Sequence, residues 1–319
     1  MECLDTRTTA TPTATQPAQV GVVIAAHNRE ELVERAVWSV YKQTLDPATI
    51  TLCLVNSASS DGTGQRLEEL RNKAPEGMQV EVVHDDQGGA ARARNLGWQA
   101  LRTPVIAFLD DDAEAAPDWL EKIRACLDRN PEVGVLAGKT EVAWLGAPPE
   151  PTLAQTVSEY VGLDYGDRPR EICYPRAPIG PNMIVRREAL AAVGGFDPSF
   201  GPHPERALVG EEGDLSLRIE KCRWKTAYEP ALQVRHLVDP ERVTPEYLLS
   251  RARIHGRSRC LVDWKHFAAW RAPRQLMRLL RGVWRVIKRR RFSIRERIDF
   301  VYGAAYFNAL RERLRASRS

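Results

Sequence analysis

Residues 105–112 read Val-Ile-Ala-Phe-Leu-Asp-Asp-Asp, an apolar run followed at once by three acidic residues. A short apolar run without alternation predicts a strand that is buried on both faces, as in a parallel sheet covered by helices. In open α/β sheets, ligands bind at the carboxyl ends of the strands. Three adjacent carboxylates there repel one another unless a cation lies among them. The stretch therefore predicts a metal site or, alternatively, a solvated acidic turn that caps the helix expected at 117–127.

Three further strand–helix units precede this strand. Apolar runs at 20–26, 51–55 and 80–83 are each followed by polar residues and then by a segment with helical spacing, the last at 90–101. Asn28 and Glu31 fit a capping box for the first helix. Successive strand–helix units predict an α/β fold with a doubly wound, mostly parallel sheet flanked by helices.

The polar loops of such a sheet converge at one edge, where we expect a nucleotide. The loop 56–63 would hold a base and ribose, and Arg94 would reach a diphosphate. Taken alone, Arg94 fits a helix-surface cation better. Carboxylate oxygens suit Mg²⁺ or Mn²⁺, which commonly bridge a protein carboxylate and a substrate phosphate. The edge therefore predicts a metal–diphosphate site.

The second half of the chain adds fewer signals. We expect a strand at 133–137 and an irregular, acceptor-facing region at 146–181, which is rich in Pro and Gly. Gly194-Gly195 predicts a helix stop followed by a turn, and Glu211-Glu212 precedes a helical pattern. His236 follows an apolar–polar alternation and so sits at a strand end, where a lone histidine is more often structural than a ligand.

In order and spacing, these segments resemble the family 2 glycosyltransferases of GT-A fold. The motifs that carry the resemblance are the runs 22–28 and 56–63, Ala-Arg-Asn at 93–95, Phe-Leu-Asp-Asp-Asp at 108–112, Asn-Met-Ile-Val-Arg-Arg at 182–187, Gly-Gly-Phe-Asp at 194–197, Glu-Glu-Gly-Asp-Leu at 211–215, and His236. Each motif alone is weak, whereas the ordered set over residues 20–240 is specific.

The resemblance implies an inverting transfer of a sugar from a nucleoside-diphosphate donor (UDP, dTDP or GDP) to an acceptor hydroxyl. The setting would be bacterial-type polysaccharide or glycoconjugate synthesis, with a glycan or lipid-linked acceptor. Mg²⁺ or Mn²⁺ would be held by Asp112, Asp110 and His236, and either Glu212 or Glu211 would be the catalytic base. The residues implied to bind the nucleotide sugar are Ala25, Ala26, Asn28, Asn56, Asp61, Arg94, Asp110, Asp111 and Asn182.

The chain departs from the family pattern at two positions. The family usually carries Asp where Asn56 stands, and that carboxylate contacts the nucleobase. Because an amide both donates and accepts, the identity of the base stays open. The acidic motif is usually Glu-Asp, whereas this chain has Glu211-Glu212.

Two other classes of protein remain as alternatives. A nucleotidyltransferase could use the same aspartates. Such an enzyme would also need a glycine-rich loop with a lysine to bind the phosphates, and the sequence contains no such loop. A non-catalytic module that binds nucleotides or carbohydrates would keep the fold without needing the paired glutamates.

Charge is unevenly distributed along the chain. The net charge is +4, yet residues 271–319 hold 15 Lys and Arg against 3 Asp and Glu. Apolar residues at helical spacing and a basic run at 288–291 predict an amphipathic helix on an anionic membrane surface or, alternatively, helices packed on the body of the protein. No nucleic-acid motif is present, and we expect no nucleic-acid partner.

We expect a disordered leader at 1–18, a GT-A glycosyltransferase domain at 19–240 and a basic amphipathic helical extension at 241–319. The six cysteines form no CxxC pair, which predicts reduced thiols. Residues 1–18 have neither the basic start nor the apolar run of a signal peptide, and no run of apolar residues is as long as we expect for a membrane span. These features predict a cytoplasmic protein or one peripheral on the inner face of the membrane.

Overall fold

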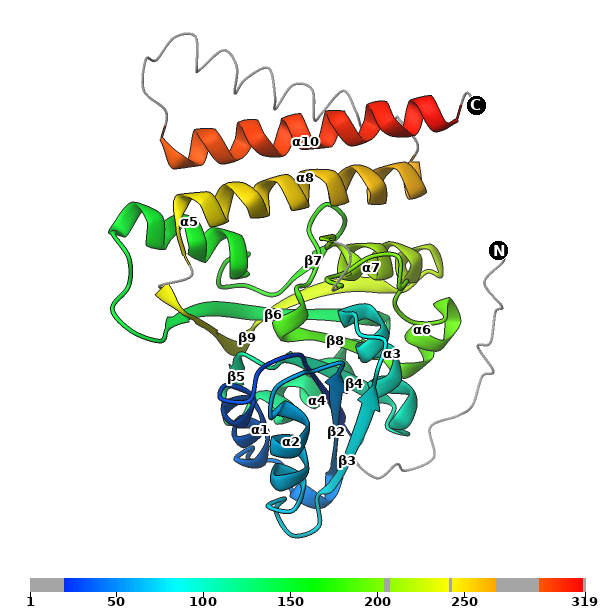
Figure 1. Ribbon diagram of the computed structural model, residues 1–319. Helices are drawn as coiled ribbons and strands as arrows, with labels where there is room; N and C mark the ends of the chain where they lie inside the picture. Colours follow the sequence, from blue (N-terminus) through cyan, green and yellow to red (C-terminus); the bar gives the residue numbers. More distant parts are fainter. Residues whose placement is uncertain (1–19, 204–206, 241–242, 268–292, 318–319) are drawn as a thin grey trace. The chain divides into compact units, whose positions relative to one another are not determined.

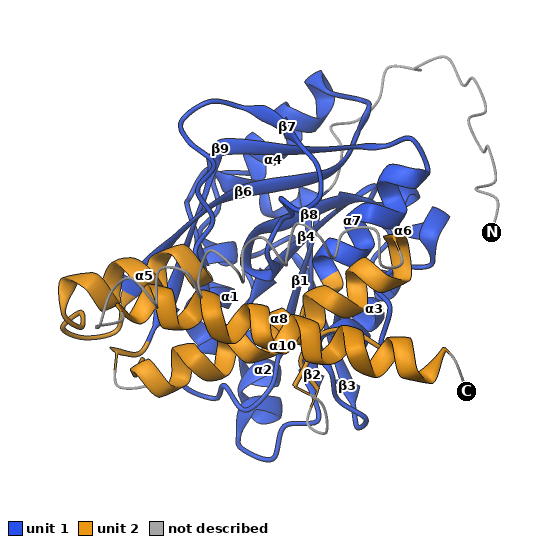
Figure 2. Ribbon diagram, turned by 90° about the horizontal axis from the view of Figure 1, so that it is seen from above, with its two compact units in different colours: residues 1–143, 162–198, 212–238 blue, residues 144–161, 199–211, 239–319 orange. Residues whose placement is uncertain are grey.

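The computed structural model describes residues 20–203, 207–240, 243–267 and 293–317. The chain divides into two compact units, coloured separately in Figure 2. Unit 1 comprises residues 1–143, 162–198 and 212–238, and unit 2 comprises residues 144–161, 199–211 and 239–319. The predicted leader at 1–18 and the basic run at 288–291 lie outside the described residues.

Unit 1 is built on one sheet with a parallel and an antiparallel part. The strands β1 (Val20–Ala26), β2 (Ile50–Ser57), β3 (Gln79–Asp85) and β4 (Val105–Asp110) are parallel and lie in the order β3-β2-β1-β4. The order continues with β8 (Met183–Arg186), β6 (Val133–Trp144), β9 (Lys225–Val238) and β5 (Ala113–Ala115). Pairing is antiparallel between β4 and β8, β8 and β6, and β5 and β9, and the short strand β7 (Arg170–Ile172) pairs antiparallel with β9. The predicted α/β fold is confirmed, and its parallel part is the N-terminal half.

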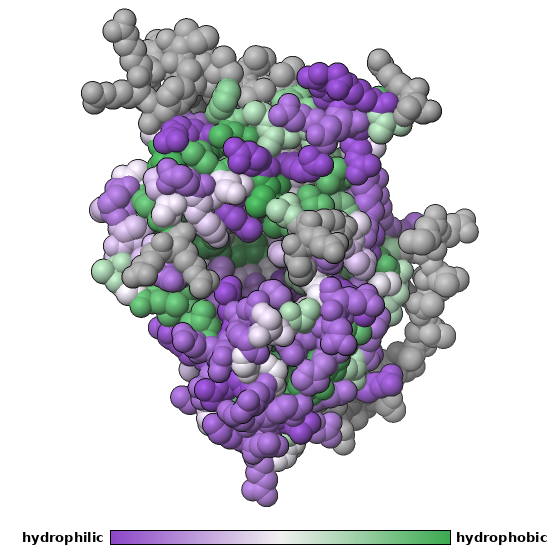
Figure 3. Space-filling view, in the orientation of Figure 1, coloured by the Kyte–Doolittle hydropathy of each residue, from purple (hydrophilic) through white to green (hydrophobic). Residues whose placement is uncertain are grey.

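Helices cover both faces of this sheet (Figure 1). Along β1, Val22 and Ile24 face one core cluster while Val23 faces the other, because successive side chains of a strand point to opposite faces. The first cluster is completed by α1 (Val33–Tyr41), α2 (Thr63–Arg71) and α4 (Trp119–Arg129). The second is completed by α3 (Ala90–Ala100), α6 (Arg187–Val193) and α7 (Glu211–Lys221). The outer surface around α1 and α2 is mainly hydrophilic, as expected for solvated helix faces (Figure 3).

Two local expectations are wrong and a third is confirmed. Leu32, rather than Asn28, occupies the N-cap of α1 and makes no capping hydrogen bond, because Asn28 turns the chain with a φ of 52°. The region 146–181 is not irregular throughout, since it contains α5 (Pro151–Val161) and β7. The helix stop is as expected, because Gly194 caps α6 in the left-handed conformation.

Unit 2 contains α5, α8 (Pro245–Phe267) and α10 (Ile294–Ala316). α8 is one continuous helix of 23 residues. It packs along α10, and the hydroxyl of Tyr306 donates to the buried carboxylate of Asp263 over 3.1 Å. A Cβ at Gly256 would lie 2.2 Å from the carbonyl oxygen of Tyr302, so only glycine permits this close approach of the two helices.

None of the described helices combines the length and the apolar character needed to cross a bilayer. Four cysteines are free thiols, namely Cys53, Cys126, Cys173 and Cys260.

Candidate active site

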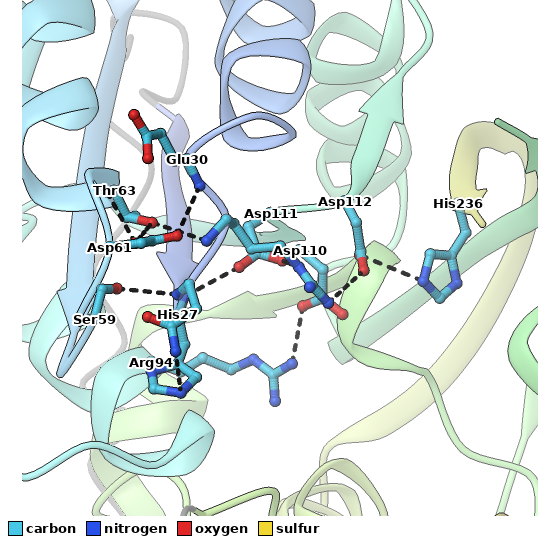
Figure 4. A network of polar contacts seen from close by, with 12 residues as sticks. His27, Glu30, Ser59, Asp61, Thr63, Arg94, Asp110, Asp111, Asp112 and His236 are labelled. Carbon is cyan, nitrogen blue, oxygen red and sulfur yellow. Dashed lines mark hydrogen bonds and ion pairs between the residues drawn. The ribbon is translucent and has the colours of Figure 1, made fainter. Parts of the chain in front are cut away.

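The three aspartates lie where β4 ends, with Arg94 beside Asp110 and His236 beside Asp112 (Figure 4). Asp110 accepts from Arg94 Nη2 over 2.9 Å. Asp111 accepts from the backbone N–H of His27 over 3.2 Å and from Arg29 Nε over 3.4 Å. The side chains of Asp111 and Asp112 are only 13% and 17% exposed. The next element is the strand β5, so a solvated turn that caps a helix does not fit this geometry.

Asp112 lies between two basic side chains. Arg29 Nη2 donates to its Oδ2 over 3.4 Å, and His236 Nε2 lies 3.3 Å from its Oδ1. β9 brings the histidine there, because His236 is directly opposite Ala113 in the antiparallel pairing of β5 with β9. The predicted pair of metal ligands, Asp112 and His236, is therefore brought together.

The carboxylates strongly influence one another's ionisation. Burial raises the pKa of Asp111 to about 7, and the charge of Asp112 adds to this effect while Arg29 opposes it. For Asp112, burial acts to raise the pKa, but the hydrogen bond and charge of His236, with Arg29, bring it below its ordinary value. Asp111 and Asp112 thus share the guanidinium of Arg29, and a divalent cation beside them would offset the repulsion between the two carboxylates.

A metal ion fits this cluster only if a bound substrate and water supply part of its coordination shell. Among the described residues, no group of three His, Cys, Asp or Glu side chains is arranged to hold a metal ion by itself. Mg²⁺ commonly takes one or two protein carboxylates and completes its shell with water and substrate phosphates. Asp112 and His236 suit such an ion, whereas Asp110 faces Arg94 instead.

The loops after β1 and β2 are tied together. Ser59 Oγ accepts from the backbone N–H of Asn28 over 3.1 Å, and Asn28 Oδ1 accepts from the backbone N–H of Ser60 over 2.8 Å. Asp61 accepts from the backbone N–H groups of Glu30 and Thr63. Asn28 and Asp61 therefore use their polar groups to hold the loop after β1 and the loop after β2 together, beside the aspartates.

Arg94 is not a helix-surface cation. It is 7% exposed, and its Nη1 lies 3.5 Å from Glu212 Oε1 while its Nη2 donates to Asp110. A Cβ at Gly180 would lie 2.2 Å from Arg94 Nη2 and 2.9 Å from Asp110 Oδ2, so this pairing requires glycine at position 180. Arg94 therefore joins the aspartate cluster to the acidic motif at the start of α7.

The two glutamates of that motif have different surroundings. Glu212 contacts Arg94, and its side chain is 17% exposed. Glu211 is 2% exposed, and a Cβ at Gly201 would lie 3.1 Å from its Cδ. Of the two predicted bases, Glu212 is the one that contacts the cluster of Arg94 and Asp110.

The remaining predicted residues divide into two groups. Ala25 and Ala26 end β1, and Ala25 is opposite Asp110 in the register of β1 with β4, so both belong to the edge that carries the aspartates. Asn182 is fully buried instead. Its Oδ1 accepts from Trp119 Nε1 over 3.0 Å, and its Nδ2 donates to the carbonyls of Lys139 and Leu232. The amide of Asn182 is therefore engaged with protein groups in the core.

Neither His27 nor Arg29 was among the site residues predicted from the sequence. The backbone of His27 and the guanidinium of Arg29 both contact the aspartates, and His27 Nδ1 lies 2.6 Å from the carbonyl oxygen of Ser57. The available signal was their position, since they directly follow a parallel strand whose neighbour carries the aspartates.

A cavity of about 850 Å³ in unit 1 lies apart from this cluster. It is bordered by residues of α1, β5 and β9, where Glu114 pairs with Arg35 and Arg235. Because Glu114 and Arg235 adjoin the Ala113–His236 pair in register, their side chains point to the opposite face of the β5–β9 ribbon. The cavity therefore does not hold the predicted site residues.

Residues 21–194 match the family model described as glycosyl transferase family 2. Glucosyl-dolichyl phosphate glucuronosyltransferase of Haloferax volcanii is 25% identical over 253 residues, which is 77% of each chain. A mannosyltransferase from Pyrobaculum calidifontis, solved with GDP-Man and Mn²⁺, superposes with a TM-score of 0.62 at 16% identity, over 96% of this chain and 90% of that one. GalNAc-T7, solved with UDP, GalNAc and Mn²⁺, superposes with a TM-score of 0.54 at 22% identity, over 74% of this chain and 47% of that one. These two structures share the fold of this chain.

Proposed function

Because the chain belongs to glycosyl transferase family 2, we propose that it moves a sugar from a nucleoside-diphosphate donor to an acceptor hydroxyl with inversion, assisted by Mg²⁺ or Mn²⁺. The observation that carries the proposal is the contact of Arg94 with both Asp110 and Glu212. Arg94 thereby connects Glu212, which could deprotonate an acceptor hydroxyl, to the aspartate cluster, which could bind a metal ion and a diphosphate. A nucleotidyltransferase or a binding module has no need of that connection.

In this function, Asp112 and His236 would hold the metal ion. The ion would supply charge that offsets the negative charge developing on the leaving diphosphate. Arg94 would add a fixed positive charge on the same side, since it is already held by Asp110. Asp111 and the loop 56–63 would position the ribose and base. Mn²⁺ in both structural neighbours supports a divalent ion, without deciding between Mn²⁺ and Mg²⁺.

Glu212 would accept the proton of the attacking hydroxyl. Glu212 contacts Arg94, which in turn contacts Asp110. Asp112 and its partner His236 lie beyond Asp110, so Glu212 and the proposed metal ligands are at opposite ends of this series of contacts. Direct displacement needs a base on the face of the sugar away from the leaving diphosphate, and this requirement is the reason for proposing inversion. Glu211 would support the turn into α7 from its buried position.

We further propose a lipid-linked glycan acceptor at a membrane surface. The Haloferax relative is named for a dolichyl phosphate substrate, which supports an acceptor of this class. α10 exposes Phe300 and Leu314 together with several arginines, namely Arg295, Arg297, Arg311, Arg313 and Arg315. Apolar and basic side chains on one exposed helix favour an anionic bilayer surface. Equal recovery of the full chain with anionic and with neutral vesicles would contradict this proposal.

The proposed reaction is tested by product analysis. The protein is incubated with UDP-, dTDP- and GDP-sugars, with Mn²⁺ or with a chelator, and the released products are separated. We expect slow, metal-dependent release of one nucleoside diphosphate. Release of pyrophosphate would indicate a nucleotidyltransferase, and binding without any release from any donor would indicate the non-catalytic module.

A further inference from the structure

Three polar side chains form a short hydrogen-bonded row beside the loop 56–63. Asn56 near the end of β2 is directly opposite His84 near the end of β3, and Glu68 belongs to α2. These three elements are labelled in Figure 1. His84 Nε2 lies 3.4 Å from Glu68 Oε1, and His84 Nδ1 lies 3.3 Å from Asn56 Nδ2. The row therefore runs from a carboxylate through an imidazole to an amide.

The chemistry of the row determines which way the amide points. A carboxylate only accepts, so Glu68 requires that His84 Nε2 carries the proton. In neutral imidazole the other nitrogen is then an acceptor, and only an N–H can satisfy it. The amide of Asn56 must accordingly turn its Nδ2 toward His84 and its Oδ1 away from it.

The oxygen that faces away is buried and has no hydrogen-bond partner among the described residues. A buried acceptor without a donor is costly, so a bound ligand that supplies an N–H would be favoured there. A Cβ at Gly64 would lie 2.8 Å from Asn56 Nδ2, so a larger residue at position 64 would clash with the amide in this orientation.

Resting on the proposed function, we infer that Glu68 and His84 are positioning residues that make Asn56 a hydrogen-bond acceptor for the donor base. The chain then selects nucleoside diphosphates whose base carries a ring N–H beside a carbonyl, namely uracil, thymine or guanine. In cytosine and adenine the ring nitrogen at the equivalent position is unprotonated and would face Asn56 Oδ1 as a second acceptor, which leaves the neighbouring exocyclic amino group as the donor on that edge and weakens the contact. Asn56 can thus accept a hydrogen bond from the base, as the aspartate usual in the family would, because His84 and Glu68 fix the orientation of its amide.

The experiment compares the affinities of UDP, dTDP, GDP, CDP and ADP by calorimetry with Mn²⁺. For the wild type we expect one of the first three to bind at least about tenfold more tightly than CDP and ADP. His84→Phe leaves the amide free to rotate, so the gap should shrink to about threefold or less. Asn56→Asp can only accept and should keep the preference. Glu69→Gln is the matched control, because Glu69 adjoins Glu68 on α2 but pairs with Arg66.

Several outcomes would overturn the inference. Tightest binding of CDP or ADP by the wild type would contradict the orientation of Asn56. An undiminished gap in folded His84→Phe would contradict the positioning role of His84, and loss of the preference in Asn56→Asp would contradict the acceptor role of Asn56. If none of the nucleotides bound with Mn²⁺, the proposed function itself would fail and this inference with it, which differs from tight binding in the wrong order.

Discussion

His236 Nε2 lies 3.3 Å from Asp112 Oδ1, so a strand near the end of unit 1 supplies the partner of an aspartate that follows β4. The register of β5 with β9 produces this contact, since it sets His236 opposite Ala113, the residue after Asp112. Two potential metal-ligating atoms, a carboxylate oxygen of Asp112 and an imidazole nitrogen of His236, therefore lie close together at the carboxyl edge of the sheet. That pairing is the basis of the first prediction.

Asp112→Asn and His236→Ala should each weaken Mn²⁺-dependent nucleotide binding by at least about tenfold, because each removes one of the two protein donors. Calorimetry with and without Mn²⁺ measures the effect. Glu114→Gln is the control, since Glu114 pairs with Arg35 and Arg235 on the opposite face of the ribbon. Wild-type metal dependence in both variants would show that the metal binds elsewhere.

Glu212→Gln should lower kcat by about 10²–10⁴-fold while nucleotide affinity stays within about threefold, because only the proton acceptor is lost. Steady-state kinetics and calorimetry separate the two effects. Glu211→Gln should cost less than about tenfold in kcat. The reverse order of the two variants would assign the base to Glu211.

Gly180→Ala should displace Arg94 from Asp110, because the added Cβ would lie 2.2 Å from Arg94 Nη2. We expect donor affinity and kcat both to fall by about tenfold or more, with the thermal midpoint close to that of the wild type. The matched control is Gly213→Ala in α7, where the nearest atom, Tyr174 Cε2, would be 3.7 Å away. Equal activity of the two alanine variants would mean that the Arg94 contacts are dispensable.

Asn182→Leu should lower the free energy of unfolding by about 2–4 kcal/mol, because it leaves Trp119 Nε1 and two carbonyl groups unsatisfied in the core. Urea denaturation measures the loss. The fraction that stays folded should bind nucleotide with wild-type affinity, since the amide is fully used by protein groups. A specific loss of nucleotide affinity without a loss of stability would restore Asn182 to the donor site.

Much of the N-terminal half was predictable because each buried parallel strand is a continuous apolar run that ends in polar residues. β1 and the aspartates after β4 lie where the pattern placed them. The antiparallel half was less predictable. β6 extends from Val133 to Trp144, well beyond the apolar stretch that signalled it, because partner strands rather than apolar sequence define its outer part.

Contacts between distant segments were the part of the site that the sequence could not supply. A histidine at a strand end has no partner until the register of β5 with β9 is known. Arg94 likewise fits a solvated helix face until Gly180 and Glu212 are seen beside it. Asn182 shows the converse, since a motif residue predicted to bind the donor is used by the core.

His255 should make unit 2 less stable in mild acid. Burial and the charge of Arg251 lower the pKa of His255 to about 4, and its ring packs edge-on against Tyr160. Between pH 6.5 and pH 4 the unfolded chain binds a proton there that the folded chain does not, so stability is lost as the pH falls through this window. From pH 7 to pH 5 the wild type should lose about 1–2 kcal/mol more than His255→Phe, measured by urea denaturation at both pH values. Phe keeps the ring contact without titrating, so equal losses in the two proteins would mean that the imidazole is protonated in the folded state.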